Sequence, residues 1–208
     1  YATGIANKLQ QVLDDWGFIA PQLVDLYETL NLGKTRHAFP FDPAMCMAPL
    51  PRAYQWADGS AYINHVELVR AARSSEVPES YYKDPLMYQG GSDDFLGAKD
   101  DVVCASEDFG IDFEAEIAVI TSDVAMQSTP DEALEGIRLV MLANDVSLRN
   151  LIPNELAKGF GFLQGKPATA FSPVAVTLDE LGSAWDNGRV NLTVQSTWNG
   201  RKVGMCEA

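Results

Sequence analysis

The stretch GIDFEAEIAVI, residues 110–120, alternates acidic and apolar residues with the two-residue period of a β-strand. Its acids, Asp112, Glu114 and Glu116, are expected to point to one face of the strand. Phe113, Ala115, Ile117 and Val119 should point to the other face. A row of carboxylates on a strand is usually a solvated edge, but it can also be the ligand set of a cation. The pattern alone leaves both interpretations open.

Helices are expected on both sides of this strand. Apolar residues recur at helical spacing in residues 5–16, 23–30 and 61–73. Thr129 and Glu132 match a capping box, in which each side chain accepts a hydrogen bond from the backbone N–H of the other residue. A helix should therefore begin directly after the threonine.

Three further segments carry strand signals. The apolar run 139–143 is short enough to be a buried strand, and residues 174–177 form another candidate. Residues 189–204 read as two strands joined at Asn199-Gly200, the pair favoured in a type I′ hairpin turn. Together with the helices, these strands predict a mixed α+β protein dominated by its strands.

The expected organisation has two parts. Residues 1–44 form a small N-terminal helical region and connector, and residues 45–208 form the strand-rich domain. The Pro-interrupted segment 36–56 should be extended. Because the chain begins at Tyr1 and ends just after a hairpin signal, it is expected to be a fragment, incomplete at its C-terminus.

Composition narrows the classes of partner. The net charge of -14 disfavours nucleic acids and anionic membranes, which need clustered lysine and arginine. No segment approaches the ~20 apolar residues of a membrane span. The three cysteines, Cys46, Cys104 and Cys206, form neither a zinc spacing nor a disulfide framework, so a cytoplasmic location is expected.

A cation site is the sharper interpretation of the acidic strand. Glu114 and Glu116 lie two residues apart, roughly 6.7 Å along a strand, so their carboxylates can converge on one ion. Asp145 directly follows the predicted buried strand and offers a third oxygen ligand. With Lys166, three carboxylates and a divalent ion sum to zero charge, which permits burial.

Other candidate residues have plain structural alternatives. His65 is one of two histidines, and it is either a packing imidazole or a general base paired with Glu67. His37 is interpreted as structural. Arg149 lies four residues after Asp145 and is expected to form a salt bridge near the site. The chain has no phosphate-binding loop motif and no nucleophile elbow, so covalent catalysis lacks a candidate.

Five motifs in register resemble the fumarylacetoacetate hydrolase family over roughly residues 45–208. They are YINHVELVR (62–70), YQGGSDDFLG (88–97), DFEAEIAVI (112–120), LANDVSLRN (142–150) and GFLQGKPATAFSP (161–173). Two departures stand out. Gln89-Gly90 replaces the Lys-Pro of the short family members, and Leu68 stands where they carry a glutamate.

The resemblance implies a β-roll-like domain that binds a divalent cation, Mg²⁺ in the first place, with Ca²⁺ or Mn²⁺ as alternatives. It also implies a role for each of nine residues. The predicted metal ligands are Glu114, Glu116, Asp145 and Asp58; the predicted catalytic residues are His65 as general base, Lys166 as carbonyl-polarising cation and Glu67 as partner of the histidine; Tyr88 and Arg149 are predicted to bind substrate.

The activity that the resemblance implies is metal-dependent hydrolysis of a carbon–carbon bond in a β-diketone, first of all 4-fumarylacetoacetate. Acylpyruvate hydrolysis, β-keto acid decarboxylation and the hydratase or isomerase steps of aromatic catabolism remain open within the family. A non-catalytic cation-binding domain is the alternative from another class. The expected partners are a small diketo acid and a second copy of the chain in a homodimer.

Overall fold

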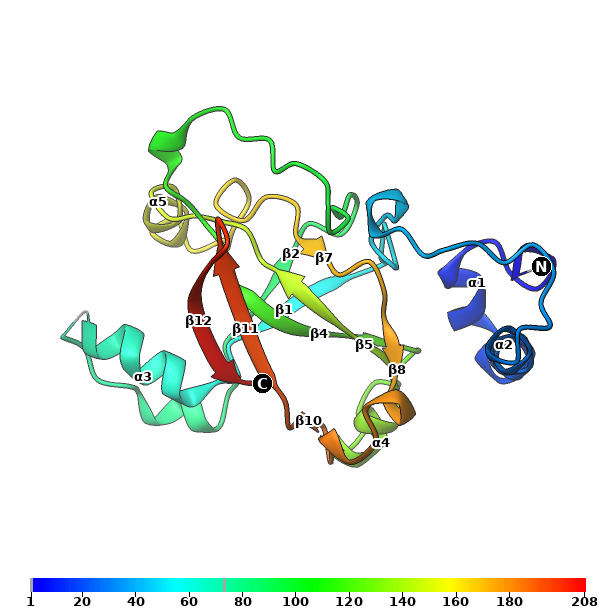
Figure 1. Ribbon diagram of the computed structural model, residues 1–208. Coiled ribbons are helices and arrows are strands. Elements are labelled where there is room, and N and C mark those ends of the chain that lie inside the picture. The colour runs from blue at the N-terminus through cyan, green and yellow to red at the C-terminus, as the bar shows by residue number, and fades with distance from the viewer. Residues whose placement is uncertain (1, 73) are drawn as a thin grey trace.

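The computed structural model describes residues 2–72 and 74–208 (Figure 1). Its helices are α1 (Leu9–Asp14), α2 (Trp16–Asn31), α3 (Ile63–Ala72), α4 (Pro130–Glu135) and α5 (Ile152–Leu156), with 3₁₀ turns η1 (Ala2–Gly4), η2 (Pro43–Met45), η3 (Glu79–Tyr82), η4 (Glu107–Phe109) and η5 (Leu178–Ala184). Its strands are β1 (Trp56–Gly59), β2 (Met87–Gly90), β3 (Ile111–Asp112), β4 (Ala115–Thr121), β5 (Ile137–Asn144), β6 (Ser147–Leu148), β7 (Ala170–Phe171), β8 (Val176–Thr177), β9 (Trp185–Asp186), β10 (Arg189–Val190), β11 (Thr193–Trp198) and β12 (Arg201–Glu207). The mixture of helices and strands confirms the predicted α+β class.

The centre of the molecule is an antiparallel sheet in the order β4–β5–β7, with β8 paired to the other end of β5. Both faces of this sheet are covered. Ala118 and Ile120 of β4 belong to one buried cluster, while Val140 of β5 belongs to a second cluster that contains Val190. A strand covered on both faces reads as a nearly continuous apolar run, which explains why residues 139–143 gave a clear signal.

The strand predicted at 110–120 is confirmed only in part. It is interrupted at 113–114, so β3 pairs with β6 and β4 pairs with β5. The apolar side predicted opposite the acids is not fully buried, because Phe113 is 40% exposed and Val119 is 41% exposed. Glu116 shares its face of β4 with the buried Ala118 and Ile120. Glu116 therefore points toward a buried cluster and not to a solvated edge.

Strands β1 and β2 pair in antiparallel fashion and form a hairpin whose long connection, residues 60–86, contains α3. This β1–β2 hairpin is attached to the sheet by aromatic packing. Trp56 of β1 meets Phe171 of β7 edge-on at 5.3 Å between ring centroids, and it meets Phe95 at 5.9 Å. Phe95 and Phe171 lie 4.9 Å apart in the same edge-to-face manner. This aromatic trio, Trp56, Phe95 and Phe171, fixes where the hairpin lies relative to the sheet.

The N-terminal helices contact the same buried cluster. Leu9, Leu13 and Trp16 pack against it, and the guanidinium of Arg138 lies 5.7 Å from the Trp16 ring centroid. The second helix differs from its prediction, because α2 begins at Trp16 and continues through Pro21. Helical stretches were expected on both sides of the proline, and the chain instead keeps one helix at the cost of a single backbone hydrogen bond.

Local turn and cap signals are confirmed. Asn199 and Gly200 both have positive φ, 49° and 76°, and they join β11 to β12 as a type I′ turn requires. Thr129 caps α4 in a reciprocal capping box with Glu132. The helix predicted at 61–73 is α3; residue 73 lies outside the described residues. Among residues 2–72 and 74–208, no helix has both the length and the apolar character needed to cross a bilayer.

The aromatic trio yields a stability prediction. Phe171 is 2% exposed, so Phe171→Ala should leave a cavity and lower the free energy of unfolding by about 3–5 kcal/mol in urea titrations. Phe160, which is 98% exposed, provides a matched control whose alanine variant should stay within about 0.5 kcal/mol of the wild type. Equal effects of the two substitutions would contradict the packing described here.

Candidate metal centre

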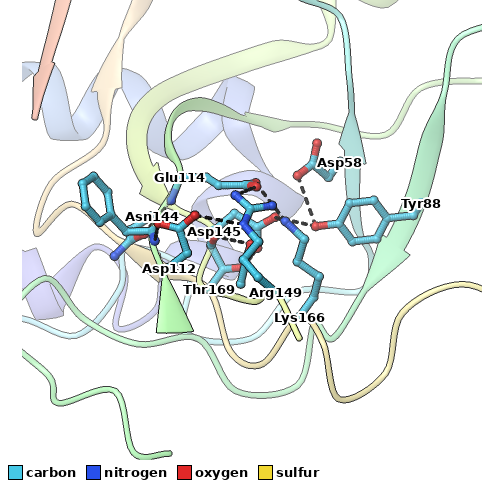
Figure 2. A network of polar contacts seen from close by, with 11 residues as sticks. Asp58, Tyr88, Asp112, Glu114, Asn144, Asp145, Arg149, Lys166 and Thr169 are labelled. Atoms are coloured by element: carbon cyan, nitrogen blue, oxygen red, sulfur yellow. Dashed lines mark hydrogen bonds and ion pairs between the residues drawn. The ribbon is translucent and has the colours of Figure 1, made fainter. Parts of the chain in front are cut away.

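Three carboxylates converge where the β1–β2 hairpin meets the sheet. Asp58, Glu116 and Asp145 each offer one carboxylate oxygen, and these oxygens all lie within 4.8 Å of one another. Asp145 is 1% exposed, and the other two are partly buried. Figure 2 shows Asp58 and Asp145 approaching from opposite sides, with Lys166 and Tyr88 beside them. We call these three residues the carboxylate trio.

Strand register explains this convergence of residues that are distant in the sequence. Ala115 pairs with Asn144, and the amide of Asp145 donates to the carbonyl of Glu114 at 3.0 Å, which brings Asp145 beside the start of β4. In the hairpin, Asp58 pairs directly with Tyr88. Residues that are directly paired on neighbouring strands have their side chains on the same face. Asp58 and Tyr88 therefore both point toward the central sheet.

The buried carboxylate of Asp145 is surrounded by donors. The ammonium of Lys166 donates to Oδ2 at 2.7 Å, and the Tyr88 hydroxyl donates to the same oxygen at 2.5 Å. Thr169 donates its hydroxyl to Oδ1 at 3.3 Å. These contacts compensate the desolvation of a charge that could not be buried alone. Desolvation opposes the charged form of Lys166, but its hydrogen bonds to Asp145 and Glu114 outweigh this and raise the lysine pKa.

Glu114 neighbours the trio and faces two cations. Its Oε2 accepts from Lys166 at 2.8 Å, and its Oε1 is paired with Arg149 at 2.6 Å. Arg149 also donates from Nε to Asp112 at 2.9 Å. The salt bridge expected for Arg149 is thus formed, although with Glu114 and Asp112 rather than with Asp145. Glu114 does not contribute to the trio, and its role as a metal ligand stays a prediction.

The electrostatics of the site indicate an excess of negative charge. Desolvation by burial, followed by the neighbouring charges of Asp58, Asp145 and Glu114, raises the pKa of Glu116 to about 8. Desolvation and the hydrogen-bonded neighbour Asp145 raise the pKa of Asp58 to about 6. With Asp112 and Glu114, the trio forms a cluster of five carboxylates that contains only two cations, Lys166 and Arg149, so negative charge remains in excess.

This donor set fits a hard divalent cation. Three carboxylate oxygens, partly buried and close together, are the ligands that Mg²⁺, Mn²⁺ and Ca²⁺ prefer. A charge of +2 would also offset most of this excess negative charge. Asp58, a ligand that only the family resemblance implied, thus lies in the trio together with Glu116 and Asp145.

Tyr88 lies inside the cluster. Its hydroxyl is within hydrogen-bonding distance of Asp145 at 2.5 Å and of Asp58 at 3.2 Å, although it carries only one proton to donate. Desolvation and these two carboxylates raise the pKa of Tyr88 far above its ordinary value. Its ring packs edge-on against Phe162 at 4.7 Å. The residue therefore orients the carboxylates, and its contact with substrate stays a prediction.

His65 and Glu67 are not brought into this cluster. Both are exposed on α3, which follows β1 directly. Neither takes part in the hydrogen bonds and ion pairs described for the site within residues 2–72 and 74–208. Their predicted roles as general base and partner therefore remain predictions.

Sequence reasoning missed two participants, Thr169 and Asp112. Thr169 lies in the quoted motif GKPATAFSP, three residues after Lys166 and directly before β7, so its position beside a candidate residue was the available signal. Asp112 was recognised as part of the acidic row, but its pairing with Arg149 depends on the distant contact between β3 and β6.

The fold and the trio define an α+β protein with a carboxylate cluster whose oxygens suit a divalent cation. Residues 55–206 match the family described as fumarylacetoacetate (FAA) hydrolase, C-terminal, and residues 1–52 match fumarylacetoacetase N-terminal domain 2. The chain belongs to the fumarylacetoacetate hydrolase family, as its motifs indicated.

Known proteins share parts of this chain. A 2,4-didehydro-3-deoxy-L-rhamnonate hydrolase of Sphingomonas sp. strain SKA58 is 31% identical over 106 residues, which are 50% of this chain and 36% of that relative. A fumarylacetoacetate hydrolase structure from psychrophilic Exiguobacterium antarcticum aligns with a TM-score of 0.57 at 22% identity, over 77% of this chain and 53% of that one. The chain thus spans roughly half or less of these proteins.

A third relative was solved with a metal. The structure of fumarylpyruvate hydrolase from Pseudomonas aeruginosa in complex with Mn²⁺ and pyruvate aligns with a TM-score of 0.54 at 11% identity. The alignment covers 83% of this chain and 74% of that one. At this identity the likeness shows a shared fold.

Loss of one ligand should weaken metal binding. Glu116→Gln removes a charge from the trio, so Mn²⁺ affinity measured by titration calorimetry should fall at least about 10-fold. Glu180→Gln, at an exposed glutamate of η5, is the matched control and should bind Mn²⁺ like the wild type. Unchanged affinity in Glu116→Gln would remove the trio as the cation site.

The raised carboxyl pKa values predict a pH dependence in chelator-treated protein. The pKa of Glu116 rises from 4.5 to about 8 on folding, so the folded state binds the proton more tightly than the unfolded state. The free energy of unfolding should therefore fall as the pH rises from 4.5 to about 8. Asp58 should contribute to this fall between pH 3.8 and about 6. Urea unfolding across the window tests this; the Glu116→Gln variant should show a shallower fall, and an equal slope would contradict the assignment.

Proposed function

We propose that this chain is the catalytic domain of a hydrolase that cleaves a carbon–carbon bond of a β-diketone, with 4-fumarylacetoacetate as the first candidate substrate. One observation carries the proposal: a partly buried trio of carboxylates fit for a divalent cation lies beside a protonated lysine. Membership of the fumarylacetoacetate hydrolase family supports this chemistry. Mg²⁺ is the first candidate ion, and the Mn²⁺ complex of a related fold supports Mn²⁺ as an alternative.

A divalent cation held by Asp58, Glu116 and Asp145 would polarise the 1,3-dioxygen unit of the substrate and stabilise the enolate that leaves. Lys166 supplies the second positive charge. Its raised pKa keeps the ammonium protonated at neutral pH, within 2.8 Å of two carboxylates. An ammonium fixed in this way can stabilise the oxyanion that forms when water adds to the ketone carbon.

Arg149 is suited to bind an acidic substrate group. Its side chain is 46% exposed, and its guanidinium uses two nitrogens, Nε and Nη2, to hold Asp112 and Glu114. A guanidinium has five N–H donors, so others remain for a substrate carboxylate. Both products expected from the cleavage, fumarate and acetoacetate, carry carboxylates, which favours a cation at this edge of the site.

His65 is the general base in this proposal. It would take a proton from the attacking water; the hydroxyl adds to the ketone carbon, the carbon–carbon bond breaks, and the enolate carbon receives a proton to give the second acid. An imidazole titrates near neutral pH and suits this role better than the carboxylates of the trio. His65 is exposed on α3, seven residues after Asp58 in the chain, so its imidazole is accessible to water and substrate.

A second substrate has a specific observation in its favour. The curated relative at 31% identity is named a hydrolase of 2,4-didehydro-3-deoxy-L-rhamnonate, whose two oxo groups also form a 1,3-pair. A diketo sugar acid would make the same demands on the cation and on Lys166. Homodimer formation, a cytoplasmic location and the lack of nucleic-acid or membrane partners stay predictions.

A substrate panel tests the activity. Fumarylacetoacetate, acetylpyruvate, oxaloacetate and 2,4-didehydro-3-deoxy-L-rhamnonate should be assayed with Mg²⁺ and with Mn²⁺, following loss of the diketone absorbance or, for oxaloacetate, release of CO₂. Cleavage of a diketone is the expected result. Stoichiometric metal binding without turnover of any compound would instead indicate a non-catalytic cation-binding domain.

The role of His65 is tested with a paired variant. His65→Ala should bind Mn²⁺ like the wild type yet lose about 10²- to 10⁴-fold in kcat, because only the proton transfer is removed. His37→Ala, at the other histidine, should keep its turnover. Full activity in His65→Ala would remove this residue from the mechanism.

A further inference from the structure

A carboxylate outside the trio holds the segment that leads into Lys166. Glu155 of α5 accepts hydrogen bonds from three consecutive backbone amides, those of Leu163 at 3.2 Å, Gln164 at 2.7 Å and Gly165 at 2.8 Å. Both of its oxygens are used, Oε1 by one amide and Oε2 by two. Successive amides that converge on one anion form a nest, and the next residue in the chain is Lys166.

The packing around Gly165 shows how closely this segment is held. A β-carbon at Gly165 would lie 2.8 Å from Oε2 of Glu155 and 2.8 Å from Cγ1 of Ile152, so no larger side chain fits without displacement. The carbonyl of Gly165 accepts from the amide of Leu148 at 2.9 Å, which ties the same residue to β6. The backbone is thus fixed from two sides immediately before the lysine.

The charge state of Glu155 agrees with this arrangement. Desolvation opposes ionisation, but hydrogen bonds from the amides of Gln164, Gly165 and Leu163 outweigh it and lower the pKa of the carboxyl. The Glu155 carboxyl is therefore ionised at neutral pH. An ionised carboxylate accepts hydrogen bonds from the three N–H groups more strongly than a neutral acid does.

Lys166 depends on this backbone because its ammonium has little freedom. The side chain is 8% exposed, and Nζ lies between Glu114 at 2.8 Å and Asp145 at 2.7 Å. A shift of the backbone at Gly165 would move the root of the lysine side chain and lengthen both contacts. Groups that orient an active-site residue in this way commonly affect activity about 10- to 100-fold.

We propose that Glu155 is a positioning residue, whose carboxylate fixes the backbone at 163–165 so that the Lys166 ammonium reaches Glu114 and Asp145. The effect of Glu155 on turnover rests on the proposed function, in which Lys166 stabilises the oxyanion. The effect of Glu155 on the position of Lys166 is independent of the proposed function. A glutamate that merely stabilised the fold would change unfolding but leave the reactivity of Lys166 in the folded protein unchanged.

The first experiment measures placement without any substrate. In Glu155→Gln, amide hydrogen exchange at 163–165, followed by mass spectrometry under native conditions, should accelerate about 10-fold or more. Modification of Lys166 by acetic anhydride should accelerate by a similar factor of about 10, because the ammonium leaves its carboxylate partners. Glu180→Gln is the matched control and should leave both rates unchanged. Exchange and labelling at the wild-type rates in Glu155→Gln would overturn the proposal.

A second variant approaches the contact from the other side. Gly165→Ala leaves Glu155 intact but places a methyl group against its carboxylate, so the same two rates should rise. Mn²⁺ affinity should not fall more than about 3-fold in either variant, since both keep all three carboxylates and a displaced Lys166 leaves more negative charge at Asp145. A fall in Mn²⁺ affinity matching that of Glu116→Gln would show a general collapse of the site and would overturn the specific role of Glu155.

Kinetics separate this proposal from the proposed function. With a substrate that the wild type cleaves, Glu155→Gln should lower kcat about 10- to 100-fold and change KM less than about 3-fold. Failure of the wild type to cleave any diketone would contradict the proposed function. Amide hydrogen exchange and Lys166 labelling would still test the role of Glu155. Wild-type kcat in a variant whose Lys166 labels faster would overturn the link between lysine placement and turnover.

Discussion

The structure depends on the burial of one charge, the carboxylate of Asp145, at the point where β5 ends. A carboxylate that is 1% exposed is stable only if its oxygens are hydrogen-bonded and its charge is compensated. Lys166, Tyr88 and Thr169 meet this requirement, and they come from two segments, β2 and the residues directly before β7. The need to satisfy Asp145 therefore draws the β1–β2 hairpin, the segment before β7 and the central sheet to one place.

The compensation remains incomplete for the surrounding cluster, and this gives the site its chemistry. Lys166 and Arg149 offset two of five carboxylates, and desolvation together with the remaining negative charge raises the pKa values of Glu116 and Asp58. Like charges held close together in a partly buried cluster lower the stability of the folded protein. Clusters of this kind are typical of functional sites. The same excess charge that destabilises the metal-free protein is what attracts a divalent ion.

Local features of the fold could be predicted from the sequence, whereas the arrangement of the site could be predicted only in part. The Asn199-Gly200 turn and the Thr129 capping box follow from the chemistry of adjacent residues, and both are present. The interruption of the strand at 113–114 depends on β6, a partner distant in the sequence, and periodicity carries no information about it. Asp58 was expected only from the family resemblance, because its position is set by the pairing of β1 with β2 and not by the E-x-E spacing.

The aromatic trio gives the hydrophobic core a second task. Trp56 lies two residues before Asp58 on β1, and Phe171 lies two residues after Thr169, so the rings that hold the molecule together also set the distance between groups on opposite sides of the cation site. Drift at these three positions during evolution would alter ion affinity even where it left the protein folded. Selection for activity and selection for a well-packed interior therefore act on the same three aromatic side chains. A substitution at one of these positions changes both the packing of the core and the geometry of the carboxylate trio.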